Sequence, residues 1–333
     1  MASGIAPFVT RRLLFLPLAL VLVSLFTFAI GRYGPGDPVE VRAGPRADPE
    51  AVERIREDLG LDDPFVIQYG RYMGDLLQGD LGDSLAQPGF TVSELVLPAL
   101  WRSAQLNVVA LVIVFGLGIP VGVFAALKRG TWIDPTVVSF FLFFQSVPVV
   151  VAIPVLLYVF TLQLGWLPSG GWDGLFEIYN PIPGVLYIPF FNSHLVIPAL
   201  VLSLPGVAGL ARLVRTTTLQ VLEDDYVRTA RAKGLDELTV VTRHVLRNAL
   251  LPVTTVVGLA MVGILEGALF TEYLYGIPGV GRVAIEAVYA RDYDVIMALT
   301  IIGASAFIVV NVLIDIAYTF VDPRVRLTDF RDR

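Results

Sequence analysis

The residues best suited to pair with charges and to cap a helix are gathered between residues 223 and 252. They are Asp225, Tyr226, Arg228, Thr229, Ala230, Arg231, Lys233 and Gly234, followed later by Leu251 and Pro252. Asp224 or Asp225 can cap the first free amides, and Gly234 can end the helix in a left-handed conformation. The pattern predicts a helix of about two turns, shorter than an isolated helix sustains in water. It therefore predicts a docking element that a partner surface holds.

No set of residues for nucleotide, metal or catalytic chemistry stands out beside this docking element. The chain lacks a G-x-x-x-x-G-K-[ST] phosphate loop, and its glycine clusters at 116–122 and 276–281 contain no Lys. It has no Cys, and no Ser/His/Asp set or pair of carboxylates is expected to meet. We therefore expect no catalytic residue, no metal and no cofactor in this chain, so that any ATP chemistry belongs to another polypeptide.

The docking element must be positioned by long apolar segments. Hydrophobic residues make up 55% of the 333 residues and charged residues only 16%, against about a quarter in ordinary soluble domains. Mean hydropathy is +0.71. Each apolar run is close to the ~20 residues that a helix needs to cross a bilayer. The predicted spans are Leu13–Ile30, Ala104–Leu127, Thr136–Leu164, Leu195–Leu213, Leu250–Phe270 and Val295–Phe320. Several Pro residues, such as Pro148, are expected to bend them.

The distribution of Lys and Arg predicts the orientation of these spans. Basic residues concentrate before the first span, at 128–129, between Arg212 and Arg247, and after the last span. This side is expected to be cytoplasmic and to hold both termini. The opposite side carries residues 31–100, with thirteen acidic residues against six Arg. Within it, Asp48, Pro49 and Gly60 predict the start and stop of a short helix.

The loop at 223–252 resembles the coupling loop in membrane subunits of ABC importers. Arg228-Thr229-Ala230 stands where that family has an Ala-containing triplet, Gly234 follows three residues later, and Leu251-Pro252 ends the motif. The triplet lacks its Glu and first Ala, and the stretch from Gly to Leu-Pro is longer than the general pattern. Both departures, with the segment His244–Pro252, are similar to the oligopeptide and dipeptide permease branch.

Other stretches extend the resemblance over nearly the whole chain, at Tyr69–Gly82, Glu272–Arg282 and Asp322–Arg326. Together they resemble the first of the two permease subunits of a peptide importer. The implied fold is all-α, with six transmembrane helices of the type I importer permease and a long, partly helical extracytoplasmic loop after the first span. The implied divisions are 1–31 with the first span, 32–96 outside, 97–322 as the transmembrane core with coupling loop 216–252, and 323–333 as a cytoplasmic tail.

The resemblance implies that the short helix docks on a separate ATPase subunit. The implied partners are two such ATPases, which bind ATP and Mg, a second homologous permease, an extracytoplasmic substrate-binding protein and the lipid bilayer, with no nucleic acid. Arg228, Arg231 and Lys233 would pair with charges on the ATPase, and Tyr226 and Ala230 would give apolar contact. The implied location is the cell membrane of a prokaryote and the implied cargo is a peptide, although relatives carry nickel, glutathione or sugars.

Candidates for the pathway or its gate are less specific. They are Gln145, Ser146, Glu266, Glu272, Pro278, Gly279 and Gly281. A carboxylate in a span is costly in hydrocarbon, which draws attention to Glu266, and the glycines after Glu272 permit a tight turn at the outer mouth. A rigid surface loop explains that turn equally well. An ion-coupled secondary transporter is an alternative class, but only Glu266 and Asp315 offer intramembrane charges, and no repeat is evident.

Overall fold

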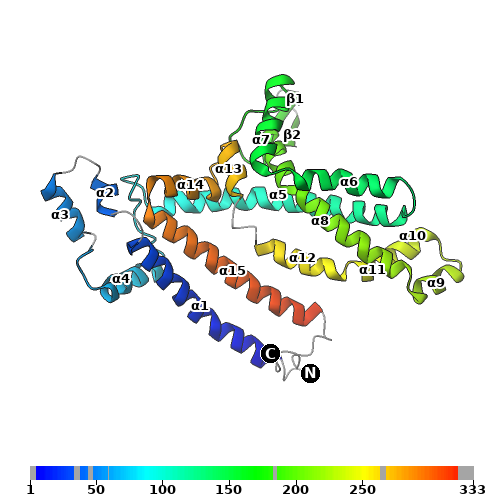
Figure 1. Cartoon of the computed structure of the whole chain (residues 1–333), viewed down its shortest axis with the longest axis horizontal. Coiled ribbons are helices and arrows are strands. Elements are labelled where there is room, and N and C mark those ends of the chain that lie inside the picture. Colours follow the sequence, from blue (N-terminus) through cyan, green and yellow to red (C-terminus); the bar gives the residue numbers. More distant parts are fainter. Residues whose placement is uncertain are drawn as a thin grey trace. The chain divides into compact units, whose positions relative to one another are not determined.

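The computed structural model describes residues 5–33, 38–43, 48–58, 60–182, 186–262 and 268–321. The chain divides into two compact units, residues 1–101 with 282–333 and residues 102–281. Helices dominate both units (Figure 1).

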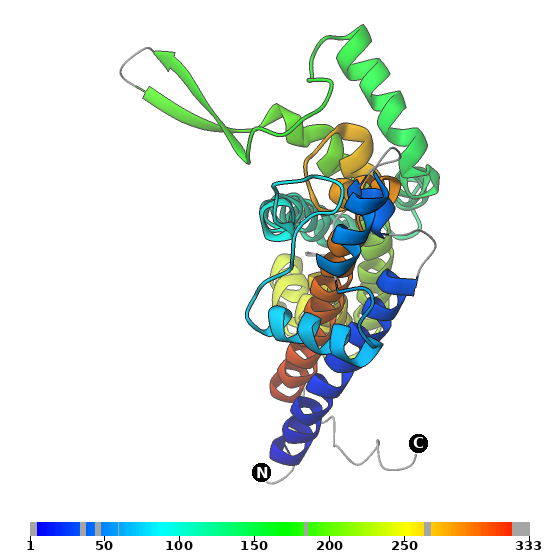
Figure 2. The ribbon, with the colours of Figure 1, turned by 90° about the vertical axis from the view of Figure 1, so that its left-hand side faces the viewer.

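The first unit contains two long helices, α1 (Ile5–Tyr33) and α15 (Tyr293–Val321). They pack side by side (Figures 1 and 2). Gly31 permits the contact, because a Cβ atom there would collide with the sulfur of Met297. Two long apolar helices that touch through a small residue are typical of membrane proteins.

Short helices follow α1 in the segment that the sequence places outside the membrane. They are α2 (Pro38–Ala43), α3 (Pro49–Asp58) and α4 (Phe65–Leu77). The bounds of α3, with Gly60 at φ +59°, confirm the predicted helix. The helix α4 packs on α1 through rings, because Phe28 lies 5.0 to 5.6 Å from the ring centroids of Phe65, Tyr69 and Tyr72.

A buried carboxylate joins the end of this outer segment to the start of α15. Asp292 accepts hydrogen bonds from the Ser84 hydroxyl, from the amides of Leu85 (3.2 Å) and Ala86 (3.3 Å), and from the amide of Val295 (3.4 Å). Behind it, the first turns of α5 (Val92–Leu127) pack with α14 (Val280–Ala290) and α15 in an apolar cluster. Residues 84–86 are thereby fixed to the helix start.

The second unit contains a sharply broken apolar segment. The helix α6 (Ile133–Ser146) ends before Val147, and α7 (Val149–Leu156) continues through a π-helical stretch, Leu157–Gln163. The two parts meet at 99°. Pro148 stands at the break, as expected of a residue that cannot continue a helix. The predicted span Thr136–Leu164 is therefore bent at this point.

The helix α8 (Val196–Leu222) is the central element of the second unit. It packs on α5 very closely, because a Cβ atom at Gly122 would lie 2.5 Å from the carbonyl oxygen of Ala211 and one at Gly118 would lie 3.0 Å from Leu210. On another face α8 packs along α6. The spacing Gly118-xxx-Gly122 thus serves helix packing, as small residues four apart do in membrane helices.

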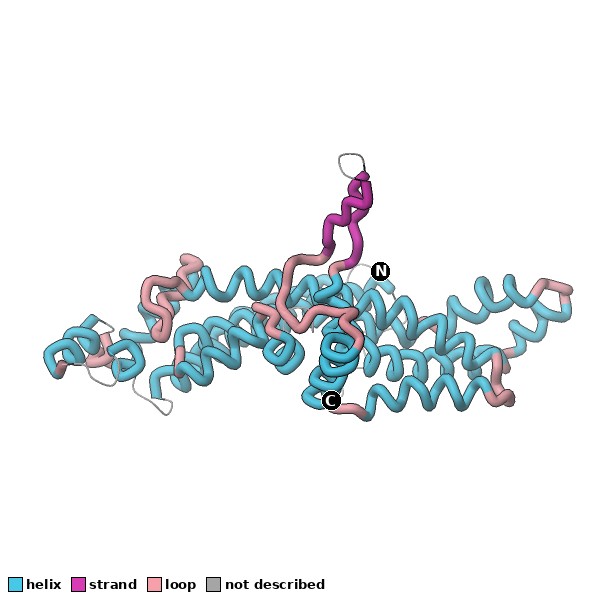
Figure 3. Tube along the Cα trace, turned by 90° about the horizontal axis from the view of Figure 1, so that it is seen from above, coloured by secondary structure: helices cyan, strands magenta, loops and turns pink. Residues whose placement is uncertain are grey.

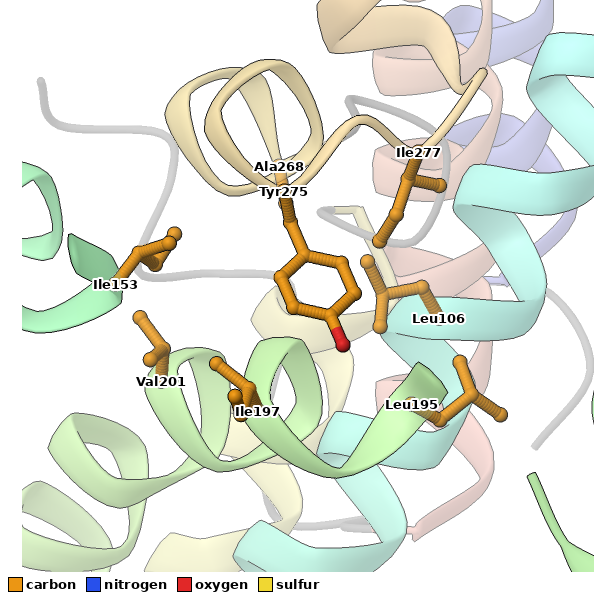
Figure 4. Packing of buried hydrophobic residues seen from close by; sticks show 8 residues of the cluster. All are labelled: Leu106, Ile153, Leu195, Ile197, Val201, Ala268, Tyr275 and Ile277. Atoms are coloured by element: carbon orange, nitrogen blue, oxygen red, sulfur yellow. The ribbon is translucent and has the colours of Figure 1, made fainter. Parts of the chain in front are cut away.

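After α8 come the helices of the docking loop, the segment of residues 223–252 that holds the predicted docking element, and the helices beyond it. They are α9 (Asp225–Ala232), α10 (Glu237–Thr239), a π-helical stretch (Val240–Val245), α11 (Leu246–Ala249), α12 (Leu251–Val262) and α13 (Leu269–Tyr275). Tyr275 from α13 enters an apolar cluster with Leu106, Ile153 and Ile197 (Figure 4). This cluster joins α13 to α5, α7 and α8.

A two-stranded hairpin projects from the second unit between α7 and α8 (Figure 3). It consists of β1 (Phe176–Ile182) and β2 (Leu186–Phe191), which are antiparallel with Phe176 opposite Phe191. The all-helical prediction misses this element. Its sequence is rich in aromatic and β-branched residues that favour strands, and Pro183-Gly184 is a turn signal between the two runs.

Among the described residues, four or five segments can cross a membrane, and they agree with predicted spans. Four are long and apolar enough to cross a membrane, at Leu14–Arg32, Val92–Leu127, Ser193–Leu222 and Tyr293–Leu313, and the bent pair α6 and α7 makes a fifth candidate. The predicted fifth span, Leu250–Phe270, contains α12, but residues 263–267 lie outside the described residues. The predicted division into domains stays a prediction.

Candidate functional site

The short helix α9 forms at the predicted place. Asp224 is extended at its N-cap (φ −68°, ψ 145°), and its carbonyl accepts from the amides of Val227 (3.1 Å) and Arg228 (3.3 Å). No side-chain cap bond forms from Asp224. At the other end Gly234 takes φ +80°, a left-handed conformation that glycine adopts without steric cost. The helix start and the glycine stop follow the sequence.

The inner face of α9 is held by the chain itself. Val227 is fully buried and Ala230 is 5% exposed, and both pack against Val240, Val245 and Ala249. The segment from α10 to α11 therefore forms a cradle under α9, a name used below for residues 237–249. The sequence alone indicates that a helix this short needs external support, but much of that support comes from the cradle. Ala230 faces the cradle, and its contact with a partner protein stays a prediction.

Polar contacts also fasten α9 to the cradle. Arg231 donates to Glu237 through Nη2 (2.6 Å) and Nε (3.1 Å), a paired geometry that is strong among charge-assisted bonds. The hydrogen bond from Arg231 lowers the pKa of Glu237. Tyr226 accepts a bond from Asn248 (2.7 Å) through its hydroxyl oxygen. Arg231 is thus engaged within the chain, and its pairing with a partner stays a prediction.

The residues opposite the cradle form the exposed face of α9. Asp225, Arg228, Thr229 and Ala232 are exposed at helical spacing, and Lys233 and Gly234 follow them in the open. The Arg228 side chain is 69% exposed and lies 3.5 Å from Asp225. Leu238, at 74% exposure, adds an apolar side chain. Leu251 and Pro252, which end the motif, are also exposed, at the start of α12. The arrangement presents a polar helix face with apolar neighbours, which suits docking.

The second candidate region is α13 together with the turn that follows it, residues 268–281, called the outer turn below. Its centre is Glu272, which is fully buried. One carboxylate oxygen accepts from the Ser103 hydroxyl (2.7 Å) and the Ala268 amide (3.0 Å), and the other accepts from the Gly281 amide (2.7 Å). The Ser103 oxygen in turn accepts from the Val280 amide (2.8 Å). Glu272 therefore ties the outer turn to α5.

The glycines of the outer turn are required by close approach. A Cβ atom at Gly279 would collide with the Glu272 carboxylate, and one at Gly281 would collide with the backbone of Leu269. The carbonyl of Pro278 accepts a bond from Arg102 (3.2 Å). Only Gly276, the C-cap of α13 at φ +75°, uses glycine's left-handed freedom here. Glu272 faces no solvent in this chain, and the role of the turn as a gate or as a rigid loop stays a prediction.

The remaining pathway candidates are separated from the outer turn in sequence. Gln145 and Ser146 are exposed at the end of α6, next to the 99° bend, and Gln145 accepts a bond from Arg212 (3.0 Å). Glu266 lies outside the described residues, as does the side chain of Asp315 in α15. Within the described ranges, no group of three or more His, Cys, Asp or Glu is arranged to hold a metal ion.

A charged contact in the second unit, between α6 and α8, cannot be read from the sequence. Asp134, in the first turn of α6, accepts two bonds of 2.6 Å from Nε and Nη2 of Arg215 in α8. In the sequence, Asp134 precedes an apolar run and indicates a helix start. Arg215 follows a predicted span and indicates the cytoplasmic side. Neither signal reveals that the two side chains meet.

Comparison with known proteins identifies the family. Residues 118–327 match the family described as binding-protein-dependent transport system inner membrane component, and residues 5–93 match its N-terminal counterpart. The chain is 35% identical to a probable peptide ABC transporter permease protein of Sinorhizobium fredii, over 96% of this chain and 99% of the relative. It is 41% identical to a di/tripeptide transport system permease protein of Pseudomonas aeruginosa, over 96% and 98%.

A solved structure supports the fold. The MetNI methionine ABC transporter in an inward-facing form matches with a TM-score of 0.50 at 18% identity, covering 68% of this chain and 96% of the solved chain. Such a likeness concerns the fold alone. With the apolar helices and the family matches, it makes the protein a multi-pass membrane protein. The chain belongs to the family of binding-protein-dependent transport system inner membrane components, the permease subunits of ABC importers.

Proposed function

We propose that this chain forms half of the translocation pathway of an ATP-driven peptide importer and receives its cargo from a substrate-binding protein. The names of the relatives, which describe peptide, dipeptide and oligopeptide permeases, support a peptide cargo. The observation that carries the mechanism is α9, a two-turn helix fixed on a cradle with its polar face exposed. A force applied to such a helix would move the helix and the cradle together as a rigid body.

The assembly that follows from this proposal contains four further proteins. Two ATPase subunits bind ATP and Mg and hydrolyse ATP, so this chain itself is no enzyme and binds no cofactor. A second homologous permease completes the pathway, and an extracytoplasmic binding protein delivers the cargo. The complex lies in the cell membrane of a prokaryote. The Lys/Arg bias supports a cytoplasmic position for α9 and for both termini.

The geometry suggests how force enters the chain. The exposed face of α9 would sit in a groove of the ATPase, with Arg228 and Lys233 meeting acidic groups there. Because Val227 and the Arg231–Glu237 pair fix α9 to the cradle, a displacement of α9 carries the cradle with it. The cradle and α9 both pack against the end of α8. ATP-driven closure of the ATPases would thus move helices of this chain as rigid bodies.

Cargo identity and energy source are tested by separate measurements. The binding protein is purified from the native organism and its bound ligand is identified by mass spectrometry; a peptide supports the proposal, and nickel, glutathione or a sugar corrects the cargo. The complete complex is then assayed in proteoliposomes. ATP-dependent uptake is expected, and uptake driven by an ion gradient without ATPase subunits would replace the importer with an ion-coupled secondary transporter.

A further inference from the structure

Two arginines of α8 hold both ends of α6. Arg215 binds Asp134 in the first turn of α6, and Arg212 binds Gln145 in its last turn. Asp134 and Gln145 are eleven residues apart, which corresponds to about 16 Å along a helix, whereas the two arginines are about 4.5 Å apart along α8. The long side chains must therefore reach in opposite directions. Together they fix the whole length of α6 against α8.

The contact at Asp134 is the stronger of the two. Both of its bonds are 2.6 Å, and they join the two carboxylate oxygens to two nitrogens of one guanidinium group. The Asp134 side chain is 9% exposed and the Arg215 side chain 28%. A paired fork of this kind fixes orientation as well as distance. Because the carboxylate is buried, loss of its partner would leave a charge that water cannot solvate well.

The same α8 leads directly to the docking helix. It ends at Leu222, and α9 begins three residues later at Asp225. Val221 and Leu222 pack against the apolar cluster that joins α9 to the cradle. Next to them, Glu223 forms a 2.8 Å ion pair with Arg129, which lies in the connection that leads into α6. α9 is therefore linked to α6 by the packing at the end of α8 and by the charged side chains of Glu223 and Arg215.

The far end of α6 is where the chain bends. Beyond Ser146 the direction changes by 99° at Pro148, and α7 then packs on the end of α13 through Ile153 and Tyr275. A rigid α6 that is fixed at both ends to α8 would deliver the motion of α8 to this bend. A loosely held α6 would absorb the motion by sliding.

We propose that Asp134 and Arg215 are positioning residues that transmit displacement of α9 to α6 and to its bend. The inference rests on the proposed function, because it requires that ATP-driven force enters at α9. This role goes beyond the topology signal that Arg215 gives in the sequence. Arg212 and Gln145, which are exposed, make a smaller contribution of the same kind.

The test uses the whole complex in proteoliposomes and measures uptake and ATP hydrolysis in the same preparation. Arg215→Gln and Asp134→Asn are each expected to lower uptake per ATP hydrolysed by about 5-fold or more, the lower range of allosteric coupling. ATP hydrolysis continues, since α9 and its cradle are unchanged. The double exchange Asp134→Arg with Arg215→Asp restores a paired contact and is expected to recover part of the lost uptake.

A matched control is the ion pair of Arg71 with Asp63, which has the same 2.6 Å separation but is far more exposed. Arg71→Gln is expected to leave uptake per ATP unchanged. If Arg215→Gln does not assemble with its partners, Arg215→Lys replaces it, with an intermediate loss expected. Unchanged uptake per ATP in assembled Arg215→Gln or Arg215→Lys overturns the inference, and so does a double exchange that recovers nothing.

Loss of the importer function and loss of the transmission role give different experimental results. If the unmodified complex shows no ATP-dependent uptake of any peptide mixture, the proposed function is wrong. If the unmodified complex takes up peptides and the Arg215 variants match it, the proposed function stands and only the transmission role of the pair is lost.

Discussion

The docking loop and the outer turn use charged residues in opposite ways. In the docking loop, Arg228 and Asp225 are exposed, and buried contact is left to small apolar side chains such as Val227 and Ala230. In the outer turn, Glu272 is fully buried and accepts three hydrogen bonds from its own chain. In the docking loop, the exposed charged groups are accessible to a partner protein. In the outer turn, the carboxylate binds groups of its own chain and so fixes the conformation of the turn.

The difference teaches that a charged residue near a turn is not by itself a pathway residue. Glu272 draws attention in the sequence because it precedes the glycines that permit a tight turn at the expected outer mouth. Its donors in the structure, the Ser103 hydroxyl and two amides, explain why it is tolerated. The comparison therefore predicts that changes in the outer turn affect folding first, and that changes on the exposed face of α9 affect coupling first.

The largest effect is expected from filling the space at Gly281. A Cβ atom there would collide with the backbone of Leu269, so Gly281→Ala should lower the free energy of unfolding by about 3 kcal/mol, the upper part of the usual range for overpacking. Thermal unfolding in detergent measures the loss. The control is Gly209→Ala in α8, where nothing lies near the added methyl group. Equal stability of the two variants would contradict the account of the outer turn.

A smaller loss is expected at the buried carboxylate itself. Glu272→Gln keeps the side-chain size but places an amide NH2 opposite one of the amide donors, which should cost about 1–3 kcal/mol. Glu286→Gln, at an exposed pair with Arg282, should change stability by no more than about 0.5 kcal/mol. Denaturant unfolding of both variants decides the matter. A Glu272→Gln protein as stable as the Glu286→Gln control would show that the network stabilises nothing.

At the docking loop, Gly234→Val should act on coupling more than on folding. Gly234 has φ +80°, a region that costs L-residues about 1–2 kcal/mol, so the end of α9 must be reoriented. Assembly with the ATPase subunits is expected to persist while uptake per ATP hydrolysed falls. Gly234→Asn, which tolerates the left-handed region, should keep most of the coupling. Full coupling in the Val variant would count against a fixed docking angle.

The smallest effect concerns the Arg231–Glu237 pair and is pH-dependent. Because Arg231 lowers the pKa of Glu237, the pair stabilises the loop fully above the ordinary Glu pKa, and this contribution is lost as pH falls through the lowered value. The pair is largely exposed, so the contribution is about 0.2–1 kcal/mol. Hydrogen exchange of α9 amides should show extra opening at acid pH, and Glu237→Gln should remove that extra pH dependence. An identical acid response in the variant would show that the pair does not stabilise α9.

The two regions also differ in how far the sequence could predict them. For α9, the start at Asp224 and the stop at Gly234 are local signals, and the structure confirms both ends. The cradle could not be predicted, because it depends on Val240 and Val245 folding back beneath Val227. The partners of Glu272 are equally remote, since Ser103 comes from another helix. Helix ends follow from neighbours in sequence, whereas burial depends on tertiary packing.

The dependence on tertiary packing also explains why the sequence did not predict the size of the bend, the hairpin or the contact between α6 and α8. Apolar runs predict where helices of the right length occur, and Pro148 predicts a bend but not its size. The hairpin at Phe176–Phe191 falls between the predicted spans, in a stretch to which the sequence analysis assigns no element, because strand-favouring residues alone do not show that two runs pair. The contact between Asp134 and Arg215 joins residues far apart in sequence, so no spacing rule reveals it.

The central claim, that the exposed face of α9 is where ATPase subunits bind, is tested most directly by labelling. The chain has no Cys, so a single Arg228→Cys variant reports on one position, and Leu77→Cys, at an 81% exposed residue of α4, serves as its control. Maleimide labelling at Arg228→Cys should slow strongly when the ATPase subunits are bound, while Leu77→Cys labels at the same rate with and without them. Equal labelling of Arg228→Cys in the free chain and in the assembled complex would contradict the account.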